Sequence, residues 1–294
     1  YLVKIKNGTV DETFLPYGGA KGPVNVIKNY GDGFYMIAGE FDQFNGENHG
    51  KLVKLKSNGA VDDTFNIGSS AEGNIHDLAI DSKDRIIAVG DFSSFNGDLY
   101  SNVVRINSDG TTDKTFRLDS GVDGAINAVE IDLNGDIILG GDFTSVGGQD
   151  IKGLVKVTEK GSIVSGWSLG GFNDSVRDID LHPNGNVLVG GFFTKHNDIK
   201  INRVALVGSK GNLIASFNPG EGPDNPVYAV SFQTDGKVLV GGSFYTFAKT
   251  IRPGIVRLHS DGTIDPTTNF GSGFNGTVQR IHEQNGESIH IGGG

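Results

Sequence analysis

Charged side chains recur about every fifty residues inside segments that are otherwise apolar. At the third and fifth positions of these segments the chain carries Lys28, Asp77, Glu130, Asp178, Asp180, Arg280 and His282. Burying such groups without partners would cost several kcal/mol for each, so they must pair with one another or reach water. Two interpretations stay open: a solvated interior in which opposite charges neutralise each other, and a polar ligand site.

The chain holds no sequence motif of an established catalytic or metal centre. Its seven histidines form no HExxH pattern, and only His282 and His290 lie near each other. No Gly-x-Ser-x-Gly elbow occurs, and no helical pattern follows the many Gly-Gly pairs, as it would in a phosphate-binding loop. The absence of cysteine excludes thiolate metal sites and disulfides. We therefore predict no catalytic residue, no metal site and no cofactor.

Composition narrows the class of partner. The 294 residues carry a net charge of −10 with no basic block, which disfavours a nucleic acid as partner. No apolar stretch approaches the length of about 18 residues that spans a membrane. Because the chain begins with Tyr1 rather than methionine, we expect it to be a segment of a larger protein.

A repeat of 50 to 51 residues positions the charged side chains. A phenylalanine closes a glycine-bearing segment at Phe41, Phe92, Phe143, Phe193 and Phe244, in steps of 51, 51, 50 and 51. A turn glycine recurs at Gly8, Gly59, Gly110, Gly161, Gly211 and Gly262, in steps of 51, 51, 51, 50 and 51. Two independent markers that keep one step establish the period.

Each unit contains four strand-like segments, which residues 75–116 illustrate. Segment A covers residues 75–81 (IHDLAID) and segment B covers residues 85–92 (RIIAVGDF). Segment C covers residues 102–107 (NVVRIN), and a short segment D ends at Phe116. Asn-Gly and Asp-Gly pairs favour tight hairpins between such segments, which predicts antiparallel strands. A four-stranded antiparallel sheet that repeats radially is a β-propeller blade. The alternative is a β-solenoid, whose coils are usually shorter than about 50 residues.

In a propeller the A strand lines the central channel, so the charged positions above would face that channel. The B segments are almost continuously apolar, as in residues 137–139 and 238–240. Such runs fit strands that are buried between neighbouring blades. The glycines that follow them would let one blade approach the next closely.

Counting the segments predicts an all-β, six-bladed ring of four-stranded blades over residues 1–294. The chain begins with an unpaired C–D pair, residues 1–6 (YLVKIK) and 11–14 (DETF). It ends with an unpaired A–B pair, residues 278–284 (VQRIHEQ) and 288–294 (SIHIGGG). Joining the two pairs would complete the sixth blade and protect the strand edges that an open ring would expose.

Aromatic residues in the loops between segments B and C are further candidates for ligand contact. They are Phe44, Phe95, Tyr100, Tyr245 and Phe247. These rings could stack on sugars, or they could anchor their own loops, which is the interpretation that we favour.

Residues 227–244 (VYAVSFQTDGKVLVGGSF) and 102–116 (NVVRINSDGTTDKTF) show the clearest form of the repeat. This pattern resembles the delta-sixty β-propeller repeat of bacterial and phage proteins, and the resemblance covers essentially the whole chain. Two units depart from its acidic-x-Thr-Phe ending, with Gly166-Trp167 and Ala215-Ser216-Phe217 in its place. Similar repeats occur in large secreted bacterial surface proteins, often from Bacteroidetes, and in phage virion or tail proteins. The resemblance supplies no catalytic residues.

The resemblance implies a non-enzymatic structural or interaction module of a large extracellular cell-surface protein or of a phage virion. In such a module a rigid ring displays loops for contact with proteins or glycans, and its partners are other domains or subunits of a larger assembly. Two alternatives stay open, because a fold does not determine a function. One is a carbohydrate-binding lectin, and the other is a glycan-active enzyme such as a lyase, hydrolase or lactonase.

Overall fold

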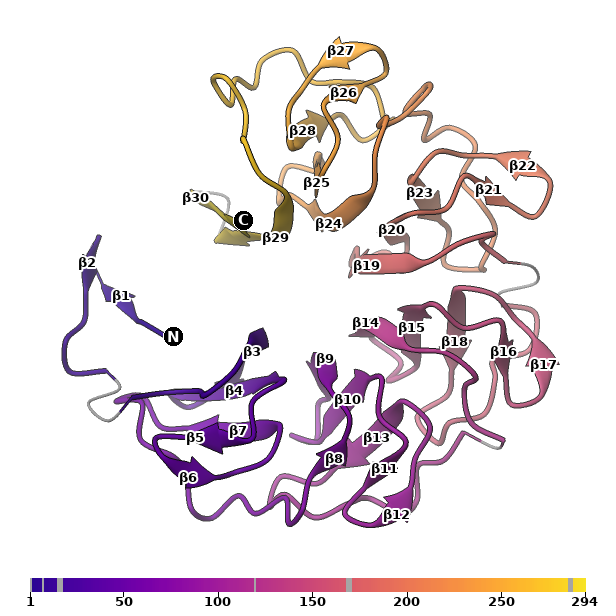
Figure 1. Cartoon of the computed structure of the whole chain (residues 1–294). Helices are drawn as coiled ribbons and strands as arrows, with labels where there is room; N and C mark the ends of the chain where they lie inside the picture. Colours follow the sequence, from indigo (N-terminus) through magenta and orange to yellow (C-terminus); the bar gives the residue numbers. More distant parts are fainter. Residues whose placement is uncertain (1, 7, 15–17, 119, 168–170, 285–287) are drawn as a thin grey trace.

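The inner strands of the molecule lie around a common centre (Figure 1). The computed structural model describes every residue except 1, 7, 15–17, 119, 168–170 and 285–287, so Tyr1 lies outside the described residues. Regular structure in the described residues consists of β-strands alone. The inner strands are β3 (Val24–Gly31), β9 (Ile75–Ile80), β14 (Ile126–Ile131), β19 (Val176–Leu181), β24 (Val227–Phe232) and β29 (Val278–Gln284).

Each inner strand pairs antiparallel with the strand that follows it. These second strands are β4 (Phe34–Gly39), β10 (Ile86–Gly90), β15 (Ile137–Gly141), β20 (Val187–Gly191), β25 (Val238–Gly242) and β30 (Ser288–Gly293). Third strands extend the first five sheets: β7 (Leu52–Leu55), β13 (Val103–Ile106), β18 (Leu154–Val157), β23 (Val204–Val207) and β28 (Ile255–Leu258). We call each inner strand with its paired strands a blade, and we number the blades 1 to 6 along the chain.

The predicted fourth strand is reduced to a single bridge in blades 1 to 5. The bridges join Leu55 to Val61, Ile106 to Thr112, Val157 to Ile163, Val207 to Leu213 and Leu258 to Ile264. In blade 2 a side-chain turn explains why the fourth strand ends early. The Asp113 carboxylate accepts hydrogen bonds from the Thr115 amide (2.9 Å) and hydroxyl (2.7 Å). Such a turn competes with the strand ladder for the backbone.

The loops between segments B and C form small hairpins of their own, which the sequence analysis did not predict. The strands are β5 (Gln43–Phe44), β6 (Glu47–Asn48), β11 (Ser94–Phe95), β12 (Asp98–Leu99), β16 (Ser145–Val146), β17 (Gln149–Asp150), β21 (Lys195–His196), β22 (Ile199–Lys200), β26 (Thr246–Phe247) and β27 (Thr250–Ile251). In blade 2 a further short strand, β8 (Ala71–Glu72), pairs with β11. Asn96 and Gly97 adopt positive φ angles of 53° and 76° between β11 and β12, the geometry that tight hairpins require.

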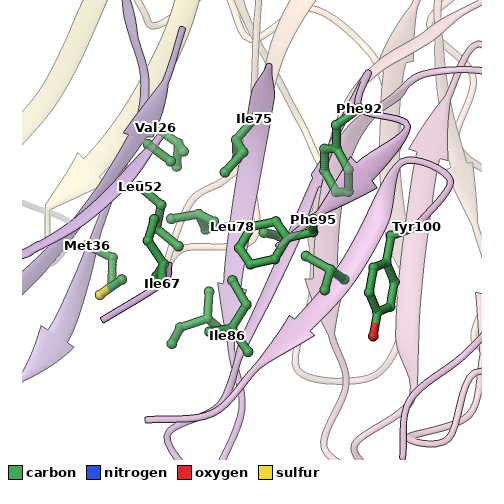
Figure 2. Packing of buried hydrophobic residues seen from close by; sticks show 14 of the residues in the cluster. Val26, Met36, Leu52, Ile67, Ile75, Leu78, Ile86, Phe92, Phe95 and Tyr100 are labelled. Carbon is green, nitrogen blue, oxygen red and sulfur yellow. The ribbon is translucent and has the colours of Figure 1, made fainter. Parts of the chain in front are cut away.

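The hydrophobic core lies between neighbouring blades. Figure 2 shows Val26, Met36 and Leu52 of blade 1 beside Ile75, Leu78 and Ile86 of blade 2. The second strands β10, β15, β20 and β25 are buried along their whole length, as their apolar runs predict.

Glycine brings the blades together, also as predicted. A Cβ atom on Gly241 of blade 5 would lie 2.5 Å from Val278 and 2.8 Å from Ile281 of blade 6. Any larger residue would therefore push the two blades apart.

The two ends of the chain do not pair with each other in the described residues. β1 (Ile5–Lys6) pairs with β2 (Thr9–Val10), and β30 pairs with β29 alone. Ile27 of β3 is 50% exposed, although the equivalent Leu78 of β9 is fully buried. This face of blade 1 is thus left uncovered, and the closure of the ring stays a prediction.

Candidate functional site

Every inner strand carries a β-bulge near its start. In β14, for example, Ile126 pairs with Gly141 and Ala128 pairs with Gly140, so Asn127 has no partner in the ladder. The residues skipped in this way, which we call the bulge residues, are Asn25, His76, Asn127, Arg177, Tyr228 and Gln279. A bulge bends a strand and redirects a side chain.

The six bulge residues line one depression, which we call the channel mouth. It has a volume of about 420 Å³, and Val24, Glu40 and Arg280 complete its lining. Since each inner strand contributes one bulge residue, the mouth lies at one end of the centre around which these strands are arranged (Figure 1). Of the residues predicted from alternation, only Arg280 lines it.

Alternation within the strands could not find the mouth, because each bulge shifts the period by one residue. One signal was nevertheless present in the sequence. Each bulge residue is polar or aromatic and directly follows an apolar residue, as in Val176-Arg177 and Val227-Tyr228.

Half of the channel mouth is bonded to the main chain. The Asn25 side-chain amide donates to the Ile75 carbonyl (3.0 Å), and the Asn127 amide donates to the Val176 carbonyl (2.9 Å). His76 Nδ1 lies 3.2 Å from the Ile126 carbonyl oxygen. In each case the partner belongs to the next inner strand, so these residues of blades 1 to 3 fasten one blade to the next.

The half formed by blades 4 to 6 has free polar groups. The side chains of Arg177, Tyr228 and Gln279 make no hydrogen bond with the described part of the chain. The Arg177 guanidinium lies 5.3 Å from the ring centroid of Phe192 and 6.0 Å from that of Tyr228. Its ion pair with Asp142 is long, at 3.9 Å. Stacking therefore holds the guanidinium while its N–H groups stay available.

The predicted charged residues of blades 1 to 4 come together in the channel. Lys28 Nζ lies 3.7 Å from Asp77 Oδ1. Asp178 accepts a hydrogen bond from the Val230 amide (2.8 Å), and Asp180 accepts one from the Phe232 amide (2.6 Å).

Asp77 likewise accepts a hydrogen bond from the Val129 amide at 3.1 Å. These three carboxylates thus bind free N–H groups of the next inner strand. That contact gives each of them a structural role in the channel.

The channel carboxyls hold their protons unusually tightly. Burial raises the pKa of Glu130 to about 8 and that of Asp178 to about 7, and it also raises the pKa of Asp180. The Asp77 carboxylate beside Lys28 raises the pKa of that lysine. At neutral pH Glu130 is therefore largely uncharged, which lowers the repulsion within a group of four carboxyls.

His282 does not join this cluster as a metal ligand. It lies exposed on β29, with its ring centroid 6.5 Å from that of His290. Among the described residues, no three His, Asp or Glu side chains are placed to hold a metal ion.

Four of the five loop aromatics named as contact candidates are buried, which fits the favoured interpretation that such rings anchor their own loops. Phe44, Phe95 and Phe247 are fully buried, and Tyr100 is nearly so. They pack under their own loops; the ring centroids of Phe41 and Phe44, for instance, are 5.8 Å apart. Tyr245, which is 58% exposed, stays available to a partner.

The chain is similar to known β-propellers. The family described as a β-propeller domain of unknown function (DUF5122) matches residues 31–65, 84–116 and 233–267, about a third of the chain. No curated protein sequence matches. No helix long and apolar enough to cross a membrane occurs in the described residues.

Solved structures extend the similarity to most of the chain. The virginiamycin B lyase from Staphylococcus aureus has 14% sequence identity and a TM-score of 0.59, covering 93% of this chain and 79% of that one. The Pan2 WD40 domain from Neurospora crassa has 12% identity and a TM-score of 0.56, covering 88% and 68%. The WD40 β-propeller domain of Doa1 has 13% identity and a TM-score of 0.50, covering 94% and 92%. The chain is thus an all-β repeat protein with a β-propeller fold, and these identities establish the fold alone.

Proposed function

We propose that this β-propeller is a non-enzymatic interaction module that binds its ligand at the channel mouth. The observation that carries the proposal is the set of free polar groups of Arg177, Tyr228 and Gln279, which face one depression from three adjacent strands. Because paired strands hold these residues, little conformational freedom is lost when a ligand binds. A carbohydrate-binding role, which uses stacking and hydroxyl contacts, is consistent with this set.

We propose further that the module is part of a large extracellular protein, on a bacterial cell surface or in a virion. The resemblance of its repeat to proteins of both kinds supports this setting, as does the net charge of −10. The ring would present the channel mouth and the exposed outer hairpins, such as the one that carries Leu99, to glycans or to other subunits.

A comparison of two tyrosines tests the site. Binding to a glycan array should be lost in Tyr228→Ala, which removes a ring at the mouth, and kept in Tyr245→Ala, which removes an exposed ring of an outer loop. If Tyr245→Ala alone abolished binding, the outer loops and not the mouth would be the contact surface.

An enzyme is the second candidate, because His76, Tyr228 and Arg177 line the same mouth. A histidine or tyrosine as general base beside an arginine could support lyase or hydrolase chemistry on a glycan. His76 Nε2 lies 3.7 Å from Asp91 Oδ2, a partner that could orient its ring. New reducing ends or unsaturated products from a bound polysaccharide would favour this candidate over simple binding.

We also propose that blade 6 is completed by the N-terminal residues, which gives a closed six-bladed ring. No described atom lies within 4 Å of a Cβ built on Gly292, whereas its equivalent Gly241 packs against the next blade. Ile27, at the position equivalent to Ile281, is correspondingly exposed. Each end of the chain thus leaves open the surface that the other would cover.

Cysteine cross-linking tests the closure, since the chain has no native cysteine. Val240 pairs with Val256 in blade 5, and the repeat aligns these residues with Ile291 and Val3. Val3→Cys combined with Ile291→Cys should form an intramolecular disulfide. A control with Lys4→Cys in place of Val3→Cys should not, because neighbouring residues point to opposite faces of a strand. Disulfide-linked dimers alone would instead indicate that the edges pair between two copies.

A further inference from the structure

The half of the channel mouth formed by blades 4 to 6 carries positive charge and groups that can hydrogen-bond to hydroxyls. Arg177 of blade 4 and Arg280 of blade 6 lie on either side of Tyr228 of blade 5, and Gln279 adjoins Arg280. Together they offer two guanidinium groups, a phenol and a primary amide to a ligand; one N–H group of Arg280 also donates a long hydrogen bond (3.5 Å) to the Asn25 carbonyl of blade 1. Glu40, the acidic residue of the lining, belongs to blade 1, in the other half of the mouth.

The positive charge of Arg177 is only weakly compensated by the protein. Its carboxylate neighbour Asp142 is 3.9 Å away and already accepts hydrogen bonds from the Asn127 amide (2.9 Å) and from the Ser175 hydroxyl. The rings of Phe192 and Tyr228, whose centroids are 5.3 Å apart, both lie within 6.0 Å of the guanidinium and hold it in place. An arginine that is oriented by stacking presents two parallel N–H groups, which match the two oxygens of a carboxylate.

The carboxyls deeper in the channel do not form an ion pair with Arg177, although the positive charge of Arg280 interacts with Asp178 and opposes the rise in its pKa. Asp178 and Asp180 point at the Val230 and Phe232 amides and bind them at 2.8 and 2.6 Å. Burial also keeps part of this group protonated at neutral pH. The free guanidinium at the mouth therefore lacks a close anion that the ligand would have to displace.

We infer, on the basis of the proposed function, that the ligand is a saccharide that carries a carboxylate, such as a uronic acid unit. The carboxylate binds Arg177, with Arg280 supplying the second positive charge. Tyr228 stacks on the sugar ring or binds a hydroxyl, and the Gln279 amide binds a neighbouring hydroxyl. A volume of about 420 Å³ lies in the range of small-molecule sites. The overall charge of −10 gives no general attraction for anions, so recognition depends on these local groups.

Calorimetric titration with two matched probes tests the inference: trigalacturonic acid and the neutral galactotriose. The wild type should bind the acidic trisaccharide at least about tenfold more tightly than the neutral one, the value of one charge-assisted hydrogen bond. Arg177→Gln should remove that preference, and Arg177→Lys, which keeps the charge without the fork, should lose part of it. Arg252→Gln, which removes a positive charge between β27 and β28, is the matched control and should bind like the wild type. Thermal unfolding of each variant establishes that it is folded.

The outcomes separate this inference from the proposed function. If both probes bound with equal affinity and Tyr228→Ala abolished that binding, the inference of an acidic ligand would be wrong, and the mouth would remain the binding site. Acidic binding that survives Arg177→Gln would overturn the assignment of the carboxylate to that residue. If neither probe bound, the inference that the ligand is a saccharide would be wrong, and so would the glycan-binding version of the proposed function.

Discussion

The stability of the protein should fall as the pH rises from about 5 to 8, and Glu130→Gln should remove much of that fall. Burial raises the pKa of Glu130 from its ordinary value of 4.5 to about 8. Between these pH values the folded protein holds a proton that the unfolded chain has released. The unfolded state then binds fewer protons, so the free energy of unfolding decreases with increasing pH.

The size of the effect follows from the difference of about 3.5 pH units. At about 1.36 kcal/mol for each unit, up to about 5 kcal/mol of stability is lost between pH 4.5 and 8. Glutamine keeps the shape of the protonated carboxyl and never ionises, and it also relieves Asp77, Asp178 and Asp180 of a neighbouring charge. We expect Glu130→Gln to match the wild type at pH 5 and to exceed its stability by roughly 2 to 5 kcal/mol at pH 9.

Urea unfolding at half-unit steps from pH 5 to 9 measures this difference. The single tryptophan, Trp167, is 5% exposed and reports unfolding by its fluorescence. Glu12→Gln is the matched control, because Glu12 is exposed, and its pH profile should follow that of the wild type. Parallel profiles for Glu130→Gln and the wild type would refute the protonated channel carboxyl.

Three further substitutions and one control test the packing. Asp113→Ala should destabilise the protein by about 3 to 5 kcal/mol, because it removes the carboxylate that lies 2.8 Å from the buried guanidinium of Arg105 and leaves that charge uncompensated. Asp109→Ala, in an exposed turn with the same Asp-x-Thr pattern, should cost about 1 kcal/mol. Similar urea midpoints for the two variants would contradict this assignment. Gly241→Ala should cost about 1 to 3 kcal/mol by overpacking the contact between blades 5 and 6. If the ring is closed, Gly292→Ala should cost a similar free energy and so lower the Tm measured in thermal unfolding. An unchanged Tm would contradict the closure.

The sequence predicted those features that depend on periodicity. The step of the phenylalanines placed the blades, and the apolar runs placed the buried second strands such as β25. Alternation also placed Asp178 and Asp180 in the channel. These features depend on local pattern and on one repeated packing rule, so a single chain carries enough information to derive them.

The site itself depends on departures from that regularity. Arg177 and Tyr228 reach the channel mouth because a bulge breaks the alternation, and a bulge is stabilised by pairing with a partner strand rather than by its own residues. The loop rings of Phe44 and Phe95 were open to two interpretations, since a ring that anchors a loop and a ring that contacts a ligand have the same composition and spacing. Only the three-dimensional neighbours, such as Phe41 beneath Phe44, distinguish them.

The hydrogen bonds from inner strands to channel carboxylates protect strand edges inside the propeller. Each inner strand is the last strand of its sheet, and unpaired N–H groups along such an edge invite pairing with foreign strands. Asp77 of blade 2 and Asp178 and Asp180 of blade 4 occupy N–H groups of the following strand, so these two blades each cover part of the open edge of the next blade. Damage to blade 2 or to blade 4 would therefore expose unpaired N–H groups in the blade that follows it, where foreign strands could pair.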